Sequence, residues 1–402
     1  MLALDCGHAF DPSREDKFFS ALPSRPAVFV IELKQRDAEP YLVRTANLRL
    51  RLERLLRAPD GPSKQLNLRE IAAEIRYRLT GSLFEQNFVL FQQARQLFPL
   101  RYRGLLRLHP PALLKVSLAN EYPRCYVTRR ILADGGFYFG PFPSRRSAEA
   151  FSNDFLNLFK LRRCQIKIRR DPSFPGCIYS EMKMCLAPCF AGCSRTEYEV
   201  ETTRVVGFLA SSGASLQSEW EREREASSVA LDFERAAGVH RKLDKLTEVL
   251  RGLPELPRKL DELDAVVLQP AAREQTIAVF VVGAGQIAEP FFLRFDDLSS
   301  SPRSVETILR EHLQAPFLSL PDSSSPATES FVASPRSRQQ DTLTDHLSLL
   351  ARWFFGKPRV GEIFFLHSGS GSSDSSQETL WPYRRIMRAC SRLLSLETWG
   401  RL

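Results

Sequence analysis

Five cysteines, Cys164, Cys177, Cys185, Cys189 and Cys193, lie within thirty residues of one another. So dense a cluster favours a metal centre over scattered buried thiols, because thiolates are strong ligands for iron and zinc. The first four are spaced C-x12-C-x7-C-x3-C. Only the second half of this pattern resembles the short C-x2–4-C pairs of zinc sites, whereas four thiolates around an iron–sulfur cluster tolerate wider spacings. The spacing therefore predicts a metal site and leaves both metals open.

The start of the chain indicates the compartment. The first eight residues are followed by charged positions, among them Asp11, Arg14 and Lys17, which is wrong for a secretory signal. The longest apolar runs, such as residues 278–283, have the length of a strand and are too short to span a bilayer. We therefore expect a cytoplasmic protein with no membrane segment, whose eight cysteines are mainly reduced thiols.

The charge balance is basic, with 56 Lys and Arg against 47 Asp and Glu and a net charge of +9. The excess is concentrated in two places. Residues 160–170 hold six basic residues and no acid, and the arginines of residues 44–57 are interrupted by Glu53 alone. Such patches suit a polyanion, because each neutralised phosphate releases condensed counterions. Nucleic acid is favoured, and a plain basic surface remains the alternative.

Apolar patterning predicts a small α+β domain over residues 22–108. Residues 27–33 and 40–43 have the composition of two strands joined by a polar turn at 34–39. A helix follows, with Leu48, Leu52, Leu55 and Leu56 on one face, and residues 59–62 end it. A second amphipathic helix is expected over residues 82–96, with Leu83, Val89, Leu90 and Leu97 apolar.

The rest of the chain divides into three further regions, which makes the expected fold class multidomain α+β. Residues 109–200 contain strands at 114–118 and 125–128, an aromatic turn sequence at 135–144, a helix to about residue 161 and the cysteines. Residues 201–253 are helical and predict a hairpin, with Asp232 as an N-cap and a seam of Val229, Phe233, Ala236, His240, Leu243 and Leu250. Residues 258–402 contain strands near 265–268, 276–282 and 291–295, and serine-rich linkers at 298–302, 321–326 and 368–376.

Two motifs resemble one known family. The segment from Asp134 to Ser144, followed by the cysteines, is similar to the cysteine-rich region of the UvrC family of excinuclease ABC components, and the string LDFERAA at 231–237 resembles the UVR motif of that family. The resemblance covers residues 22–300. It implies a [4Fe–4S] cluster on Cys164, Cys177, Cys185 and Cys189, with zinc as the alternative and Cys193 as an extra cysteine. It also implies double-stranded DNA as a partner. The residues implied to dock UvrB, another component of excinuclease ABC, are Leu231, Phe233, Glu234, Arg235, Ala236 and Ala237.

The first domain sits where this family carries a GIY-YIG nuclease. The resemblance implies that Tyr41, Arg51 and Glu85 are the catalytic residues, that Glu85 holds Mg²⁺ or Mn²⁺, and that the three converge on one face. Phe29 stands where the family has tyrosine, and Val43 where it has glycine. Phe29 has no hydroxyl to exchange a proton with water. The residues expected to bind DNA are Arg44, Asn47, Arg49, Lys160, Arg162, Arg163, Lys167, Arg169 and Arg170.

These departures lead us to expect a nucleotide-excision-repair protein that binds DNA and whose phosphodiester cleavage is weak or lost. The alternatives are an active single-site GIY-YIG endonuclease and an iron–sulfur adaptor on DNA. The family's second nuclease, an RNase-H-like domain, and its helix–hairpin–helix module would lie beyond residue 390, and we expect neither to be present. Residues 264–367 resemble, loosely, the linker that leads into that domain.

Overall fold

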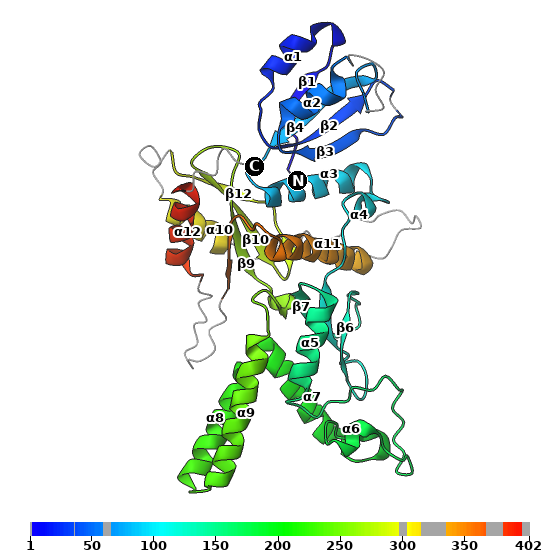
Figure 1. The fold of residues 1–402 in the computed structure, drawn as a ribbon, viewed down its shortest axis with the longest axis vertical. Helices are drawn as coiled ribbons and strands as arrows, with labels where there is room; N and C mark the ends of the chain where they lie inside the picture. Colours follow the sequence, from blue (N-terminus) through cyan, green and yellow to red (C-terminus); the bar gives the residue numbers. More distant parts are fainter. Residues whose placement is uncertain are drawn as a thin grey trace.

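The computed structural model describes residues 2–35, 37–58, 66–296, 304–314, 335–366 and 381–395. The predicted turn at 59–62 and the three serine-rich stretches lie outside the described residues. Within those ranges the chain forms three antiparallel sheets stacked along the long axis of the molecule, with a helical hairpin projecting from one end (Figure 1). The predicted mixed α+β class is confirmed.

The first sheet has the order β1-β4-β2-β3. Its strands are β1 (Cys6–Ala9), β4 (Ala72–Leu79), β2 (Ala27–Leu33) and β3 (Tyr41–Thr45). Helices α1 (Glu15–Ala21) and α2 (Leu48–Leu56) cover one face, and α3 (Leu83–Leu97) lies against the other. The predicted leucine face of α2 is buried. Strands β1 and β4 were not predicted from the sequence. In β4, glutamate and arginine alternate with apolar residues.

The second sheet has the order β6-β5-β7-β8. Its strands are β6 (Cys125–Thr128), β5 (Ala112–Val116), β7 (Phe137–Phe142) and β8 (Arg258–Lys259). The prediction of a turn over residues 135–144 is wrong for most of its length. All six residues of β7 are buried, and the turn is confined to its start, where Gly135 has a φ of 65°. Helix α5 (Arg145–Leu156) follows and ends before the predicted residue 161.

The cysteine loop and three long helices come next. The loop contains α6 (Ile178–Glu181) and a 3-10 turn (Pro188–Phe190), and it leads into α7 (Arg195–Ala210), α8 (Ala214–Val229) and α9 (Phe233–Arg251). Helices α8 and α9 form the predicted hairpin, but its predicted seam is partly wrong. Val239 and Leu246 are the buried residues of α9, whereas Val229, Phe233 and His240 are exposed.

The third sheet has the order β11-β10-β9-β13, with β12 paired to β10. Its strands are β11 (Gln286–Ile287), β10 (Thr276–Gly283), β9 (Ala265–Pro270), β13 (Glu362–Phe365) and β12 (Phe291–Arg294). The cluster on one face includes residues of α10 (Val305–Gln314) and α12 (Tyr383–Ser395), and the cluster on the other includes residues of α11 (Pro335–Phe355). The short helices are η1 (Pro12–Arg14), α4 (Tyr102–Leu105) and η3 (Leu260–Glu262). No helix in the described ranges is long and apolar enough to cross a membrane.

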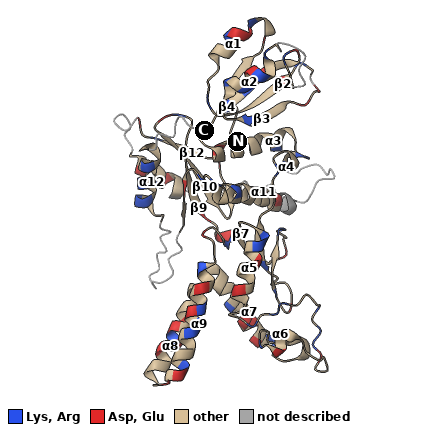
Figure 2. Ribbon diagram, in the orientation of Figure 1, with Lys and Arg blue, Asp and Glu red and all other residues tan. Residues whose placement is uncertain are grey.

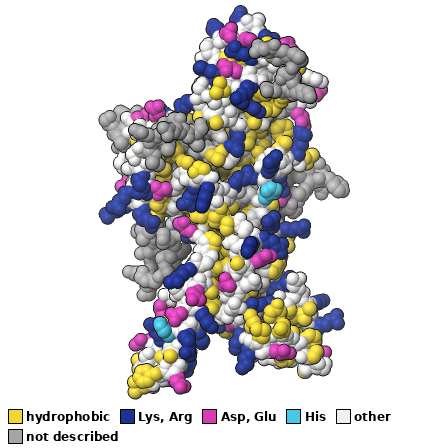
Figure 3. All heavy atoms as spheres, viewed as in Figure 1, with side chains coloured by type: hydrophobic (Ala, Val, Ile, Leu, Met, Phe, Trp, Pro, Cys, Tyr) yellow, Lys and Arg dark blue, Asp and Glu magenta, His cyan; other side chains and the backbone are white. Residues whose placement is uncertain are grey.

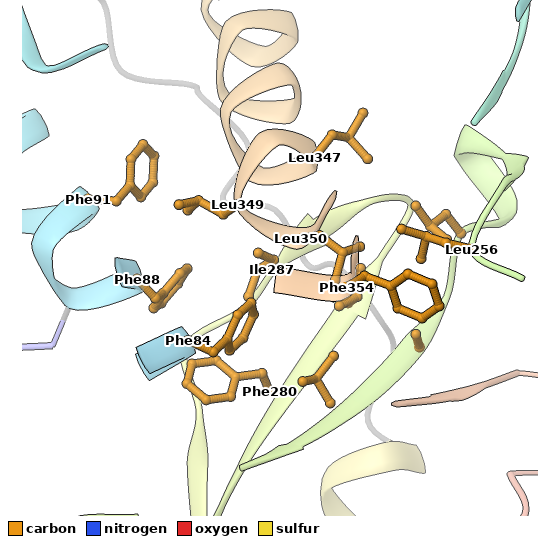
Figure 4. Close-up of a cluster of buried hydrophobic side chains, with 14 of the residues drawn as sticks. Phe84, Phe88, Phe91, Leu256, Phe280, Ile287, Leu347, Leu349, Leu350 and Phe354 are labelled. Carbon is orange, nitrogen blue, oxygen red and sulfur yellow. The ribbon is translucent and has the colours of Figure 1, made fainter. Parts of the chain in front are cut away.

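One hydrophobic core joins the first and third sheets, and α3 lies in the middle of it. The rings of Phe84 and Phe88 lie with their centroids 4.9 and 5.6 Å from that of Phe280 on β10. Figure 4 shows the three phenylalanines of α3 directed toward α11 and the third sheet. The contact is so close before α3 that a side chain on Gly81 would overlap the backbone of Ala271. The buried face of α3 therefore carries Phe84, Phe88 and Phe91, while Leu83 is 48% exposed.

Candidate functional site

Two of the three predicted catalytic residues are in contact. The hydroxyl of Tyr41, on β3, accepts a hydrogen bond of 2.9 Å from Nη2 of Arg51, which lies on α2. Phe29 is the register partner of Val43, and its ring centroid lies 6.4 Å from that of Tyr41. Phe29, Tyr41 and Val43 share the face of the first sheet that α2, the helix of Arg51, covers. Phe29 is completely buried there, so its ring fills part of the core.

Glu85 does not join this pair, contrary to the expected convergence on one face. Successive side chains of a strand point to opposite faces, so Phe29 faces α2 while Val28 packs in the core that contains α3. Glu85 lies in the first turn of α3, and it lines a hollow together with residues from the end of β4 and from the third sheet. Arg51 and Glu85 therefore belong to helices on opposite faces of the first sheet.

Glu85 is buried, with 1% of its surface exposed. Its Oε2 accepts a hydrogen bond of 2.8 Å from the backbone N–H of Gly81. Beside it is a hollow of about 310 Å³ that is also lined by Arg78, Arg273 and Arg294. Burial raises the pKa of the Glu85 carboxyl to about 7, and the Gly81 hydrogen bond and the charge of Arg78 oppose that rise. A carboxyl so enclosed has little access to a hydrated ion.

Some of the predicted DNA-binding side chains are free to contact DNA, and others form hydrogen bonds within the protein. Those that are exposed, with no ion pair among the described residues, are Arg44, Lys160, Lys167, Arg169 and Arg170. The others make internal contacts. Asn47 caps α2 by accepting from the N–H of Leu50, Arg49 donates to the carbonyl of Leu22 at 2.7 Å, and Arg163 donates to Asn157 at 2.9 Å.

Arg162 is a correction to the predicted DNA-binding set. It is 6% exposed, and its guanidinium donates to the carbonyls of Tyr122 at 2.8 Å and Ile166 at 3.0 Å. A side chain enclosed in this way cannot reach a phosphate. Its Nη1 also lies 3.8 Å from Sγ of Cys164, which makes it part of the cysteine loop.

The four predicted ligand cysteines gather in this loop. Burial, together with the nearby sulfurs of Cys164, Cys177 and Cys189, raises the pKa of the Cys185 thiol to about 11. The N–H of Ala187 donates to Sγ of Cys185 at 3.3 Å. Within the described ranges, however, no three or more His, Cys, Asp or Glu side chains are arranged to hold an ion. The thiols are near one another without forming a ready coordination shell.

The fifth cysteine has a different environment. Cys193 is 6% exposed and belongs to the hydrophobic core of the second sheet, with Tyr198 and Val205. Burial raises the pKa of its thiol. This placement fits its interpretation as an extra cysteine.

The predicted partner-binding residues lie at the free end of the helical hairpin. Asp232 caps α9 by accepting from the N–H of Arg235 at 3.1 Å, which confirms the predicted N-cap. Val229, Leu231 and Phe233 are 76%, 71% and 68% exposed. The hairpin shaft carries alternating charges, whereas its tip is apolar (Figures 2 and 3). Of the remaining predicted residues, Glu234, Arg235 and Ala237 are exposed and Ala236 is half-buried.

Arg78 was missed by the sequence interpretation, although a signal was present. Ile75, Tyr77 and Leu79 alternate with arginines over residues 75–79, which is the pattern of a strand with one polar face. Recognising β4 would have placed Arg78 close to the segment that begins α3.

Comparison with known proteins gives consistent matches. Residues 112–208 match the family model described as the UvrC/Cho excinuclease middle domain. The chain is 29% identical to UvrABC system protein C of Carboxydothermus hydrogenoformans over 271 residues, which are 66% of this chain and 43% of that protein. It is 26% identical to the Moorella thermoacetica protein of the same name over 296 residues (72% and 47%), and 23% identical to that of Clostridium beijerinckii over 350 residues (85% and 54%). The chain thus spans about half the length of the curated relatives it matches. No solved structure matches it.

The burial of Glu85 predicts a pH-dependent cost to stability. The pKa of Glu85 is about 7 in the folded chain and 4.5 in the unfolded chain, so between these pH values the folded state binds more protons. The free energy of unfolding therefore falls as pH rises from 4.5 to about 7. Glu85→Gln keeps an oxygen for the Gly81 N–H and removes the charge. We expect this variant to be more stable than the natural protein above pH 7, by up to about 3 kcal/mol, and the gain to vanish below about pH 4.5.

Urea unfolding at several pH values measures this difference. The exposed Glu225 supplies the control, since Glu225→Gln should give no gain that grows between the two pH limits. A Glu85→Gln stability difference that does not change with pH would contradict the assignment.

Proposed function

The chain belongs to the UvrC family, and from that premise we propose that it acts in nucleotide excision repair as a DNA-binding protein whose own phosphodiester cleavage is weak or lost. The loss of cleavage is supported by the packing of two helices: α2, which carries Arg51, and α3, which carries Glu85, lie against opposite faces of the first sheet. In a GIY-YIG site the metal-holding glutamate and the arginine must act on one phosphate. Here their helices lie on opposite faces of the sheet.

The remaining parts of the site support the same proposal. Phe29 cannot transfer a proton, and the Tyr41 hydroxyl accepts a hydrogen bond from Arg51. A general base typically contributes about 10²–10⁴ in rate, so its loss leaves slow chemistry at most. The Tyr41–Arg51 pair also favours a second candidate, a working one-site nuclease in which Tyr41 serves as the base.

One cleavage assay separates the two candidates. A labelled DNA duplex is incubated with Mg²⁺ or Mn²⁺ and with the natural protein, Glu85→Ala, Phe29→Tyr or Phe29→Tyr/Val43→Gly. We expect retained, salt-sensitive binding, little or no cutting by the natural protein, and little recovery from Phe29→Tyr alone, because Val43 and the position of Glu85 are unchanged. Brisk cleavage by the natural protein that Glu85→Ala abolishes would establish the active nuclease instead.

We further propose that Cys164, Cys177, Cys185 and Cys189 hold one [4Fe–4S] cluster, with zinc as the alternative. The chemistry of the donor set supports this, as does the buried guanidinium of Arg162, which forms no ion pair among the described residues. A buried cation requires a nearby negative charge, and metal-bound thiolates would supply it. When bound, the cluster would cross-link the loop. Arg162 and the N–H of Ala187 would stabilise the sulfur charge.

Metal content tests this assignment. Anaerobically purified protein should be brown and contain iron, and Cys177→Ser/Cys189→Ser should lose both the colour and the iron. Cys6→Ser, in the first domain, is the matched control and should retain them. Colourless protein with stoichiometric zinc would replace iron with zinc at the same site, and natural protein with neither metal would reject the site.

We also propose that the hairpin tip docks UvrB, the partner component of the UvrABC system. Three exposed apolar side chains at one end of a charged shaft support a protein partner. Burying one such side chain contributes about 1.5–3 kcal/mol, so Leu231→Ser/Phe233→Ser should weaken binding more than tenfold. Val200→Ser, at a 56% exposed apolar position on α7, is the control. Calorimetric titration that finds equal affinity for the double variant and the natural protein would count against the tip.

A further inference from the structure

Two neighbouring hollows lie where the first domain, the connecting segment after α4, α11 and the second sheet meet. Their volumes are about 470 and 320 Å³, and both are lined by His109 and Arg352. Arg44 and Arg107 line the larger hollow, and Arg129 lines the smaller one. We call these five residues the arginine seam. They come from segments as far apart in the sequence as β3 and α11.

The positive charge of the seam is not neutralised. No aspartate or glutamate lines either hollow. Within the part of the chain that the structure describes, none of the four seam arginines forms an ion pair. The nearby Arg103, in contrast, is neutralised by Asp345 at 2.9 Å and Asp341 at 3.2 Å.

Arg352 is held in place without losing its charge. Its guanidinium donates to the carbonyl oxygens of Leu106, at 3.2 Å, and of Arg107. Carbonyls orient a guanidinium but leave its full positive charge. Burial and the like charge of Arg44 lower the pKa of Arg352. An anion between Arg352 and Arg44 would relieve the repulsion of their like charges.

Neutral donors surround the same hollows. Asn87 of α3 lines the larger one, and Ser144 lines the smaller one as the N-cap of α5. The N-terminus of this twelve-residue helix adds a partial positive charge and free N–H groups. Cationic side chains, an amide and a helix N-terminus, which here line two neighbouring hollows, are the kinds of group that bind phosphate.

We propose that the arginine seam binds consecutive phosphates of one strand of a DNA duplex. The inference rests on the DNA-binding function proposed above and assigns part of the DNA-binding surface to the arginine seam. Two open hollows side by side fit a chain of phosphates better than a single enclosed anion. Because Arg44, Arg129 and Arg352 belong to three parts of the fold, one backbone segment would span all three.

The seam also determines which face of the first domain the strand meets. Arg44 alternates with Val43 along β3, so it lies on the side of the sheet that α3 covers. Tyr41 and Arg51 lie on the other side. DNA bound at the seam is therefore held away from that pair, which agrees with binding in which cleavage is weak or lost.

The test measures how salt weakens binding of a fluorescein-labelled 20-base-pair duplex. Each lost phosphate contact should reduce the slope of log K against log salt by about 0.9. Arg129→Ser/Arg352→Gln should therefore bind less tightly and have a slope shallower by about one to two. Arg129→Lys/Arg352→Lys keeps the charge and should keep most of the slope. Arg222→Ser/Arg241→Ser removes two exposed arginines of the hairpin shaft and should match the natural protein.

Circular dichroism melts identify any variant that fails to fold, and in that case Arg44→Ser/Arg129→Ser replaces it, because both of these side chains are exposed. Natural protein with no salt-sensitive binding would overturn the DNA-binding function. Binding by the natural protein with an unchanged slope in folded neutral variants would overturn the seam alone. Titration with dAMP forms the second arm. Tight dAMP binding that the neutral variant loses, with duplex binding unaffected, would assign the seam to a free nucleotide and overturn the DNA assignment.

Discussion

The packing of α3 between two sheets is the constraint on which the rest of the structure depends. Phe84, Phe88 and Phe91 form one buried stripe that closes the core of the first domain and meets Phe280 and α11 on the other side. A helix held on both sides cannot rotate without breaking both contacts. Its position fixes where Glu85 points, and its first turns bring Asn87 to the edge of the arginine seam.

The same packing explains why the residues of a nuclease motif occur here without assembling a site. Tyr41 and Arg51 keep their hydrogen bond because β3 and α2 are local neighbours. Glu85 belongs to a helix whose environment is set by a sheet almost two hundred residues later in the chain. A metal ligand must be positioned within about half an ångström of its productive geometry. Aromatic side chains require only burial against other apolar residues, which many arrangements provide.

The elements predicted from the sequence are those whose pattern is local. The leucine face of α2, strands β2 and β6, and the N-cap Asp232 follow from spacing alone, and the structure contains them. Spacing alone does not predict which side chains the tertiary structure buries. The basic composition of residues 160–170 does not distinguish Arg162, which is enclosed by carbonyls, from Arg169, which is exposed. Likewise, the 3-and-4 spacing of α9 fits two seams, and only packing against α8 selects the one with Val239 and Leu246. Arg129 and Arg352 are separated by more than two hundred residues, so no motif could have paired them.

The double role of α3 also restricts how this protein can evolve. A substitution on the aromatic stripe alters packing against two sheets at once, so it must be compatible with both. The first and third sheets should then open together as one cooperative unit in hydrogen exchange, although almost two hundred residues separate them in the chain. Selection for stable packing would conserve α3 even after selection for catalysis by Glu85, in its first turn, had ended.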